Sequence, residues 1–173
     1  MKPFVKFGLI TGLAVGIWNL SCFSIASWLN SSFSIGIPSA RLRAYSGLFG
    51  VVVLLVGIYA GMKSIKRQND GTLTYKQAVT TGIGISVITA LIAGTFAFIY
   101  CTVINPGYTD YMVQDAQKAL LAAHKSPDEI NQQLAQARRQ FSTTSQVMQA
   151  LIGQSVVGSV CSLIIGIFTK TKK

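Results

Sequence analysis

Ionisable side chains that could transfer a proton or bind a metal ion are gathered in one segment of the chain, residues 105–144. The segment contains the only histidine and four of the five acids, namely His124, Asp110, Asp115, Asp128 and Glu129. General acid–base catalysis needs such groups to meet at one substrate atom. Ser126 and Glu129 are instead spaced as a helix capping box, and a group such as His124 near a helix C-terminus suits the dipole. We therefore assign no catalytic residue, and a membrane enzyme is the weakest functional hypothesis.

The three cysteines, Cys22, Cys101 and Cys161, show neither CxxC nor metal-ligand spacing. We expect small packing residues, no metal site and no cofactor. Cys22 and Cys101 lie near the predicted outer ends of their helices, where an oxidising compartment would permit a disulfide. The sequence leaves this pairing open. It contains no phosphate-binding glycine loop and no HExxH or GxSxG motif.

A cluster of cations interrupts the apolar pattern in the middle of the chain, at Lys63, Lys66, Arg67 and Lys76. Such a cluster can bind an anionic lipid headgroup or an acidic partner. It also retains a loop on the cytoplasmic side of a membrane, and we favour this second interpretation.

Amides within the apolar runs could line a polar path. They are Asn19, Gln149 and Gln154. Hydrogen bonding between packed helices is the simpler explanation. Because ion coupling normally requires ionisable groups within the membrane, and none lies near the centre of a run, an ion-coupled transporter is not expected.

The elements that carry these groups are four long segments free of Asp, Glu, Lys, Arg and His. Each can hold about 20 residues, enough to cross the hydrocarbon core as a helix. Only 12% of the residues are charged and 50% are hydrophobic, far from the balance of a soluble domain. We predict an all-α integral membrane protein, one membrane domain over residues 1–173, with transmembrane helices at about residues 4–28, 45–62, 78–104 and 145–168.

Cations predict the orientation of these helices. With the N-terminus inside, nine of the 15 Lys and Arg residues fall on the inner side. Both termini should then be cytoplasmic, in a bacterial inner membrane. The first run exceeds the apolar length of a secretory signal, so we expect it to be a retained helix. Attraction to anionic lipids accounts for the net charge of +10, and no nucleic-acid partner is expected.

The connections differ in length and composition. Residues 29–43 should form a short irregular crossing, and Asn69-Asp70-Gly71 a tight turn. Residues 105–144 contain two helical patterns after the break at Pro106. They predict either an extracytoplasmic helical hairpin, with Phe141 and Leu134 packed on Met112 and Leu120, or outward extensions of the third and fourth spans.

Small residues recur every four positions along the spans, as at Gly8, Gly12 and Gly16 in the first and Gly57 and Gly61 in the second. Such stripes let helix backbones approach closely. We favour packing within one bundle, and the Gly8 stripe is the best candidate for an oligomer interface instead.

Three stretches resemble a known family. They are KFGLITGLAVGIW from Lys6 to Trp18, GIYAGMKSIKRQNDGTLTYKQAVTTG from Gly57 to Gly82, and YCTVINPGY from Tyr100 to Tyr108. In order and content they are similar to a domain-of-unknown-function family of small four-span inner-membrane proteins common in Bacteroidota. The resemblance implies a four-helix membrane fold without an assigned activity. Because relatives are often encoded near membrane glycosyltransferases, the resemblance further implies an accessory role in the envelope, by analogy alone.

Two functions therefore remain. The first is a non-enzymatic accessory or scaffold subunit of an envelope complex, bound to a membrane-protein partner or to further copies of itself, and to membrane lipids. The alternative is a small transporter or lipid-handling protein, which requires Asn19, Gln149 and Gln154 to converge on one cavity.

Overall fold

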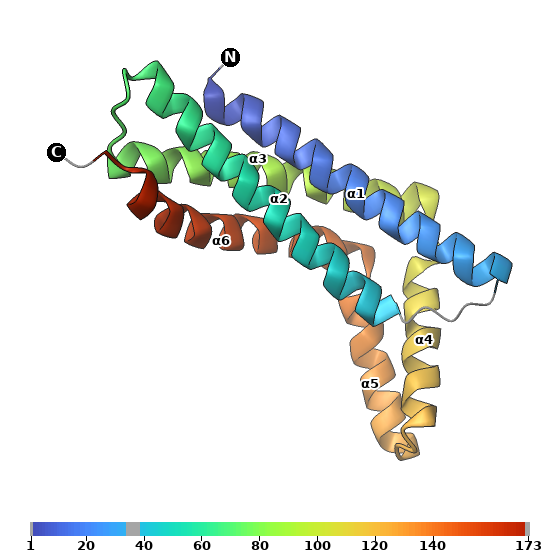
Figure 1. Ribbon diagram of the computed structural model, residues 1–173. Helices are drawn as coiled ribbons and strands as arrows, with labels where there is room; N and C mark the ends of the chain where they lie inside the picture. Colours follow the sequence, from blue (N-terminus) through green and yellow to red (C-terminus); the bar gives the residue numbers. More distant parts are fainter. Residues whose placement is uncertain (1, 34–38, 172–173) are drawn as a thin grey trace.

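The computed structural model describes residues 2–33 and 39–171, and the side chains of these residues except those of Phe23, 25–33 and 39–44. Throughout these ranges the ordered elements are helical (Figure 1). They are α1 (Pro3–Phe33), α2 (Ser39–Gln68), α3 (Tyr75–Ile99), the π-helical turn η1 (Tyr100–Ile104), α4 (Tyr108–Ala122), α5 (Pro127–Gln140) and α6 (Thr143–Thr169).

Four segments are long and apolar enough to cross a membrane: Pro3–Cys22, Tyr45–Gln68, Tyr75–Ile104 and Thr143–Thr169. The prediction of an all-α membrane protein with four transmembrane helices is thus confirmed. Most of the crossing predicted over residues 29–43 is helical instead, because α1 continues to Phe33 and α2 begins at Ser39. Extending a formed helix adds a hydrogen bond for each residue that it orders, which offsets the modest helix propensity of serine and asparagine. Gly36 and Pro38, and the side chains of Arg41 and Arg43, lie outside the described residues.

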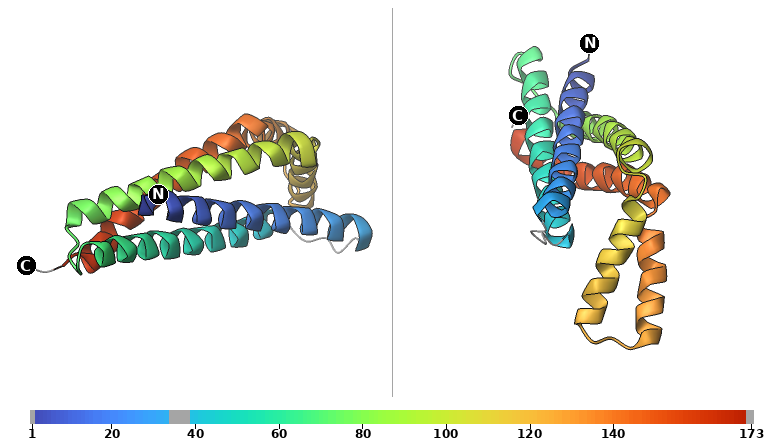
Figure 2. Two further views of the ribbon diagram at one scale, coloured as in Figure 1. Left: turned by 90° about the horizontal axis from the view of Figure 1, so that it is seen from above. Right: turned by 90° about the vertical axis from the view of Figure 1, so that its right-hand side faces the viewer.

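The four long helices form a bundle in which α3 is the most central. It packs on α1, α2 and α6, and α2 also packs on α1 and α6. Both chain termini and the α2–α3 turn lie at one end, which we call the terminal end (Figure 1). The α1–α2 layer and the α3–α6 layer diverge toward the opposite end, the hairpin end, from which α4 and α5 project (Figure 2).

The distribution of apolar side chains suits a lipid solvent. The core cluster is buried and contains Leu54, Ile58, Met62, Leu73, Ala78 and Ile85. Many other large apolar side chains of the same helices are exposed, for example Val56 at 62% and Leu91 at 58%. In water these surfaces would be costly, whereas in a bilayer they face acyl chains of equal polarity.

The glycine stripe of α1 faces α3. A Cβ added at Gly8 would stand 2.8 Å from the Ile88 side chain, and one at Gly16 would stand 2.6 Å from Phe96. Gly12 likewise lies against Ile92. The stripe therefore packs against α3 within one chain.

The second stripe and the α3–α6 contact use small residues in the same way. Gly57 lies against Thr11, and Gly61 against Ile85. Gly82 of α3 faces Ser162 of α6, while Gly158 of α6 faces Ser86 of α3. The last four form a reciprocal contact between antiparallel helices. Each serine returns its hydroxyl to its own helix, Ser86 to Gly82 O at 2.7 Å and Ser162 to Gly158 O at 2.6 Å.

Residues 105–144 form a hairpin of separate helices and do not simply extend the spans. α5 starts with the predicted capping box between Ser126 and Glu129. It ends at Gln140, and Ser142 caps a new helix, α6. At the base of the hairpin Phe141 packs on a cluster that includes Met112, as predicted.

The predicted turn at residues 69–71 is present, with positive φ at Asp70 (49°) and Gly71 (81°). It is tied to the end of the chain because Thr171 N donates to Leu73 O at 2.9 Å and Leu73 N donates to Thr171 Oγ1 at 2.9 Å. The terminal end of the bundle is therefore closed by one backbone–backbone hydrogen bond and one bond to the Thr171 hydroxyl.

Candidate functional site

A cavity of about 250 Å³ lies between the diverging layers near the hairpin end. Residues from α1, α2, α3, η1, α4 and α6 line it. Its polar groups are amides and phenols, from Asn19, Tyr100, Tyr108, Gln146, Gln149 and Gln154. The three amides singled out in the sequence thus line one space, although they come from helices at opposite ends of the chain.

Both polar atoms of the Asn19 side chain form hydrogen bonds. Its Nδ2 donates to Val15 O at 3.0 Å within α1, and its Oδ1 accepts a 2.8 Å hydrogen bond from Ser46 Oγ of α2. Ser46 is only 2% exposed. Asn19 therefore joins α1 to α2 and fixes one wall of the cavity.

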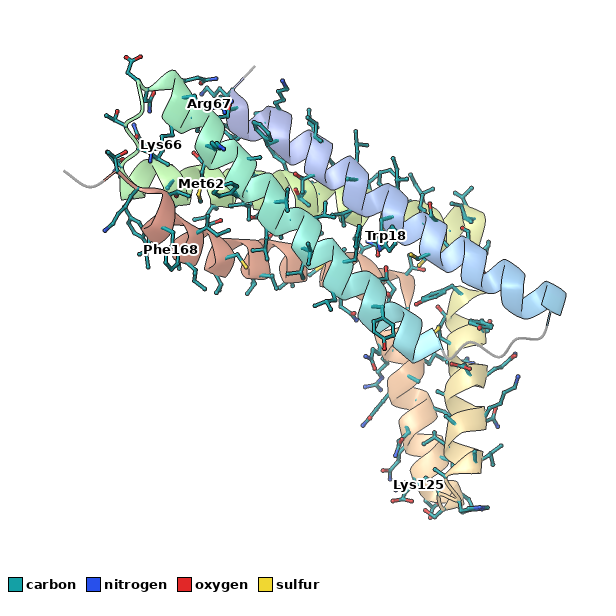
Figure 3. All side chains as sticks on the ribbon, in the orientation of Figure 1. Trp18, Met62, Lys66, Arg67, Lys125 and Phe168 are labelled. Carbon is teal, nitrogen blue, oxygen red and sulfur yellow. The ribbon has the colours of Figure 1, made fainter. Side chains whose placement is uncertain are left out.

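Gln154 presents an unsatisfied acceptor on the opposite wall. Its Oε1 is buried and accepts no hydrogen bond from the residues that the structure describes. The other buried side-chain atom in this condition is Nε1 of Trp18, which stacks on Phe49 with 4.0 Å between ring centroids (Figure 3). A buried polar atom without a partner costs about 1–3 kcal/mol. Both atoms lie in the half of the bundle that contains the cavity.

Gln149 and Gln146 are anchored where α6 meets the hairpin. The Nε2 atoms of both side chains donate to Gln140 O, at 3.3 Å from Gln149 and 2.9 Å from Gln146. These bonds use the last carbonyl of α5, which its own helix leaves unpaired. The wall formed by α6 is therefore tied to the base of the hairpin.

The π-helical turn η1 supplies the aromatic part of the lining. Asn105 N donates to Tyr100 O at 2.7 Å across five residues, directly before Pro106, which has no N–H to continue an α-helix. The turn buries Tyr100 and Cys101 together. Tyr100 meets Tyr108 edge to face at 5.6 Å, and its hydroxyl accepts from Asn105 Nδ2 at 3.2 Å.

This lining is suited to neutral groups that form hydrogen bonds. Among the described residues that line the cavity there is no Asp, Glu, His, Lys or Arg. The described chain also holds no cluster of three metal-ligating side chains. Amide, phenol and aromatic surfaces are typical of sites that bind uncharged polar molecules.

The candidate cations lie at the other end of the bundle. Lys63, Lys66 and Arg67 line a groove between α2 and α6, whereas Lys76, at the start of α3, is not among its lining residues. The structure therefore separates one cation from the other three.

Two acids of the hairpin, Asp110 and Glu129, take part in local contacts. Asp110 pairs with Arg138 at 3.5 Å, and both side chains are about 70% exposed. Hydrogen bonds from Ser126 and the charge of Lys125 lower the pKa of the Glu129 carboxyl. His124, two residues after the end of α4, has φ of 52°. The three cysteines are free thiols, so the structure contains no Cys22–Cys101 disulfide.

Sequence reasoning missed the aromatic half of the site and Gln146. The break at Asn105-Pro106 was recognised, but not the π-helical register that follows from it. The four-residue spacing of Gln146, Ala150 and Gln154 could have indicated one polar helix face.

Comparison with known proteins adds one finding. The family described as "Protein of unknown function (DUF4199)" matches residues 6–171. The resemblance to a family of unknown function is thereby confirmed, and its distribution among Bacteroidota stays a prediction. No curated protein and no solved structure matches the chain significantly.

Proposed function

The chain belongs to the DUF4199 family, whose function is unknown, and we propose from its cavity that it binds the neutral, hydroxyl-rich headgroup of a lipid-like molecule. The observation that carries this proposal is the convergence of Asn19, Gln149 and Gln154 on one uncharged space. Such lining groups donate and accept hydrogen bonds without preferring either sign of charge.

The size and surroundings of the cavity favour an amphiphile. At about 250 Å³ it is smaller than most sites for whole small molecules, which occupy about 300–1,000 Å³, and suits a headgroup. Exposed apolar side chains cover the outer surfaces of the surrounding helices, including Ile152 at 55% and Phe98 at 54%. An alkyl chain can lie along these surfaces while the headgroup occupies the cavity.

The test uses octyl glucoside, octanoate and octyltrimethylammonium, which share an alkyl chain and differ in charge. Binding to the protein in lipid nanodiscs is measured by isothermal titration calorimetry. We expect the glucoside to bind at least about tenfold more tightly than either charged amphiphile, and Gln154→Leu to remove about 1.4 kcal/mol or more of that affinity. Thr95→Val, on the exposed face of α3, is the matched control and should bind normally.

Equal binding of all three amphiphiles, or normal binding by Gln154→Leu, would contradict the proposal. In that case the amides serve only to join the helices.

An accessory or scaffold role remains the second candidate, and the hairpin supports it. α4 and α5 project away from the bundle (Figures 1 and 2). Tyr111 and Leu121 on α4 are 39% and 56% exposed. Since the glycine stripes are occupied within the chain, the hairpin is the surface we propose for a membrane-protein partner, of which a membrane glycosyltransferase is one possibility by analogy. Repeated purification of a lone monomer in digitonin would count against this role.

For the orientation, we propose cytoplasmic termini in the inner membrane. The excess of cations on the side of the terminal end supports this arrangement. Green fluorescent protein fused to the C-terminus should fluoresce, because it matures in the cytoplasm, whereas alkaline phosphatase fused there should be inactive. Active phosphatase would reverse the topology.

A further inference from the structure

Three cations of α2 face one groove at the terminal end. Lys63, Lys66 and Arg67 are spaced three and four residues apart, which places them on one helix face. The groove has a volume of about 590 Å³, and Tyr59, Phe168 and Thr169 also line it. Figure 3 places Lys66 and Arg67 on the last turns of α2 and Phe168 on the last turns of α6.

Lys66 is fixed by the neighbouring helix. Its Nζ donates to Thr169 O at 3.3 Å, at the last residue of α6. A cation in this position also offsets the negative end of the helix dipole. Lys66 is partly buried while Lys63 and Arg67 are exposed. The lysine thus forms the floor of the groove, and the other two charges remain available to a ligand.

The charge of the groove is not neutralised by the protein. The ion pairs Lys125–Glu129 and Arg138–Asp110 do not involve these three cations, and no Asp or Glu is among the described residues that line the groove. The nearest acid in sequence, Asp70, belongs to the exposed turn that follows α2. The groove therefore favours an anion.

Aromatic and apolar side chains place this site at a membrane interface. Tyr59 is 50% exposed and Phe168 82% exposed, as is typical of aromatic residues at the headgroup level. Toward the hairpin end, α2 and α6 expose Val56 at 62% and Ile164 at 52%. A phosphate bound in the groove would thus have an apolar surface for acyl chains beside it. Neither a free phosphate nor an acidic protein segment would need such a surface.

We propose that this groove binds the phosphate of an anionic phospholipid from the leaflet at the terminal end. Arg67 and Lys63 donate to the phosphate oxygens, since exposed guanidinium and ammonium groups are strong donors to that group. The lipid chains follow the exposed faces of α2 and α6. This site is independent of the cavity at the hairpin end, which has no charged lining.

Lys76 provides a matched control on the same side of the membrane. It is the second residue of α3 and follows Tyr75, which donates to Leu163 O at 3.5 Å and has Lys170 6.0 Å above its ring. Lys76 lies outside the lining of the groove. Removing its charge changes the net charge of the surface without touching the site.

The experiment is native mass spectrometry of protein released from nanodiscs that contain equal amounts of phosphatidylglycerol and phosphatidylcholine. Wild type should retain phosphatidylglycerol preferentially. Because an interfacial cation contributes about fivefold to anionic lipid binding, the double variant Lys63→Gln/Arg67→Gln should lose about twenty-fivefold of that preference. Lys76→Gln should keep it. Both side chains of the double variant are exposed, and an unchanged melting temperature verifies its fold.

Two results would overturn the proposal. Equal losses in Lys76→Gln and in the double variant would mean diffuse attraction by surface charge. Displacement of phosphatidylglycerol by inorganic phosphate at millimolar concentration would mean that the groove holds a soluble anion.

Discussion

Replacement of Gln154 by leucine should stabilise the protein and weaken its ligand binding at least about tenfold. Oε1 of Gln154 is buried without a partner among the described residues. Leucine is of similar size and has no polar atom to desolvate. The cost of an unpaired acceptor is about 1–3 kcal/mol, and the lower part of this range applies in a bilayer, where hydrogen bonds contribute about 0.6–2 kcal/mol. We therefore expect a gain of about 1 kcal/mol.

Asn19→Leu is the matched comparison on the opposite wall. Asn19 Oδ1 accepts from Ser46, which is 2% exposed, so the substitution leaves a buried hydroxyl unpaired. The expected loss is about 1–2 kcal/mol. For a protein of this size 1 kcal/mol corresponds to about 2–4 °C in melting temperature. Leucine at position 154 should therefore raise the melting temperature of the protein, and leucine at position 19 should lower it.

The assay is thermal unfolding in detergent without and with octyl glucoside. A ligand at a hundred times its dissociation constant stabilises the folded state by about 2.7 kcal/mol. Wild type should gain this amount, whereas Gln154→Leu, with its lower affinity, should gain at least about 1.3 kcal/mol less. If Gln154→Leu is destabilised as much as Asn19→Leu without ligand, the Gln154 amide is structurally satisfied and the reasoning fails.

Three further predictions concern the bundle and the hairpin. Gly82→Ala should lower the free energy of unfolding by about 1–3 kcal/mol, because the added methyl group meets the Ser162 side chain. Ser162→Gly should restore most of this loss when unfolding of the double variant is measured. No restoration would mean that the two residues do not contact. His124→Gly should stabilise the hairpin by up to about 1 kcal/mol, because φ of 52° strains a residue with a Cβ, and reduced hydrogen exchange in α4 would show it. Ser126→Ala should cost about 1 kcal/mol in hairpin stability, through the lost cap of α5. The lowered pKa of Glu129 adds a pH dependence: its stabilising contribution is complete above the ordinary value of 4.5 and is lost as the pH falls through the lower folded-state value. Hydrogen exchange of α5 across this range should show the loss in wild type and a weaker one in Ser126→Ala.

Much of the architecture was predictable from residue types. Apolar runs of about 20 residues without charge cross a bilayer as helices, since a helix satisfies all the backbone hydrogen bonds within one segment. The capping box at Ser126 and the turn at Asp70-Gly71 were equally readable, because each depends on neighbours within a few residues. The helical continuation of α1 to Phe33 could not be predicted, since serine-rich segments suit either a helix or a loop.

The candidate site was predictable in part. Asn19, Gln149 and Gln154 stood out as amides within apolar runs, which are costly unless they have a partner or a function. Their meeting in one cavity, and the addition of Tyr100 and Tyr108, depends on the divergence of the two helix layers.

The sequence by itself determined that the chain forms four membrane-spanning helices with a helical segment between the last two, because hydrophobic length and charge act locally. Only the tertiary structure decided which glycines face which helix, which three of four cations share a groove, and that the amides of α1 and α6 line one cavity. Helices of equal apolar character can pack in many rotations. The choice among these rotations is made by the fit of small residues such as Gly82 and Gly158 against their partners, which a single sequence does not display.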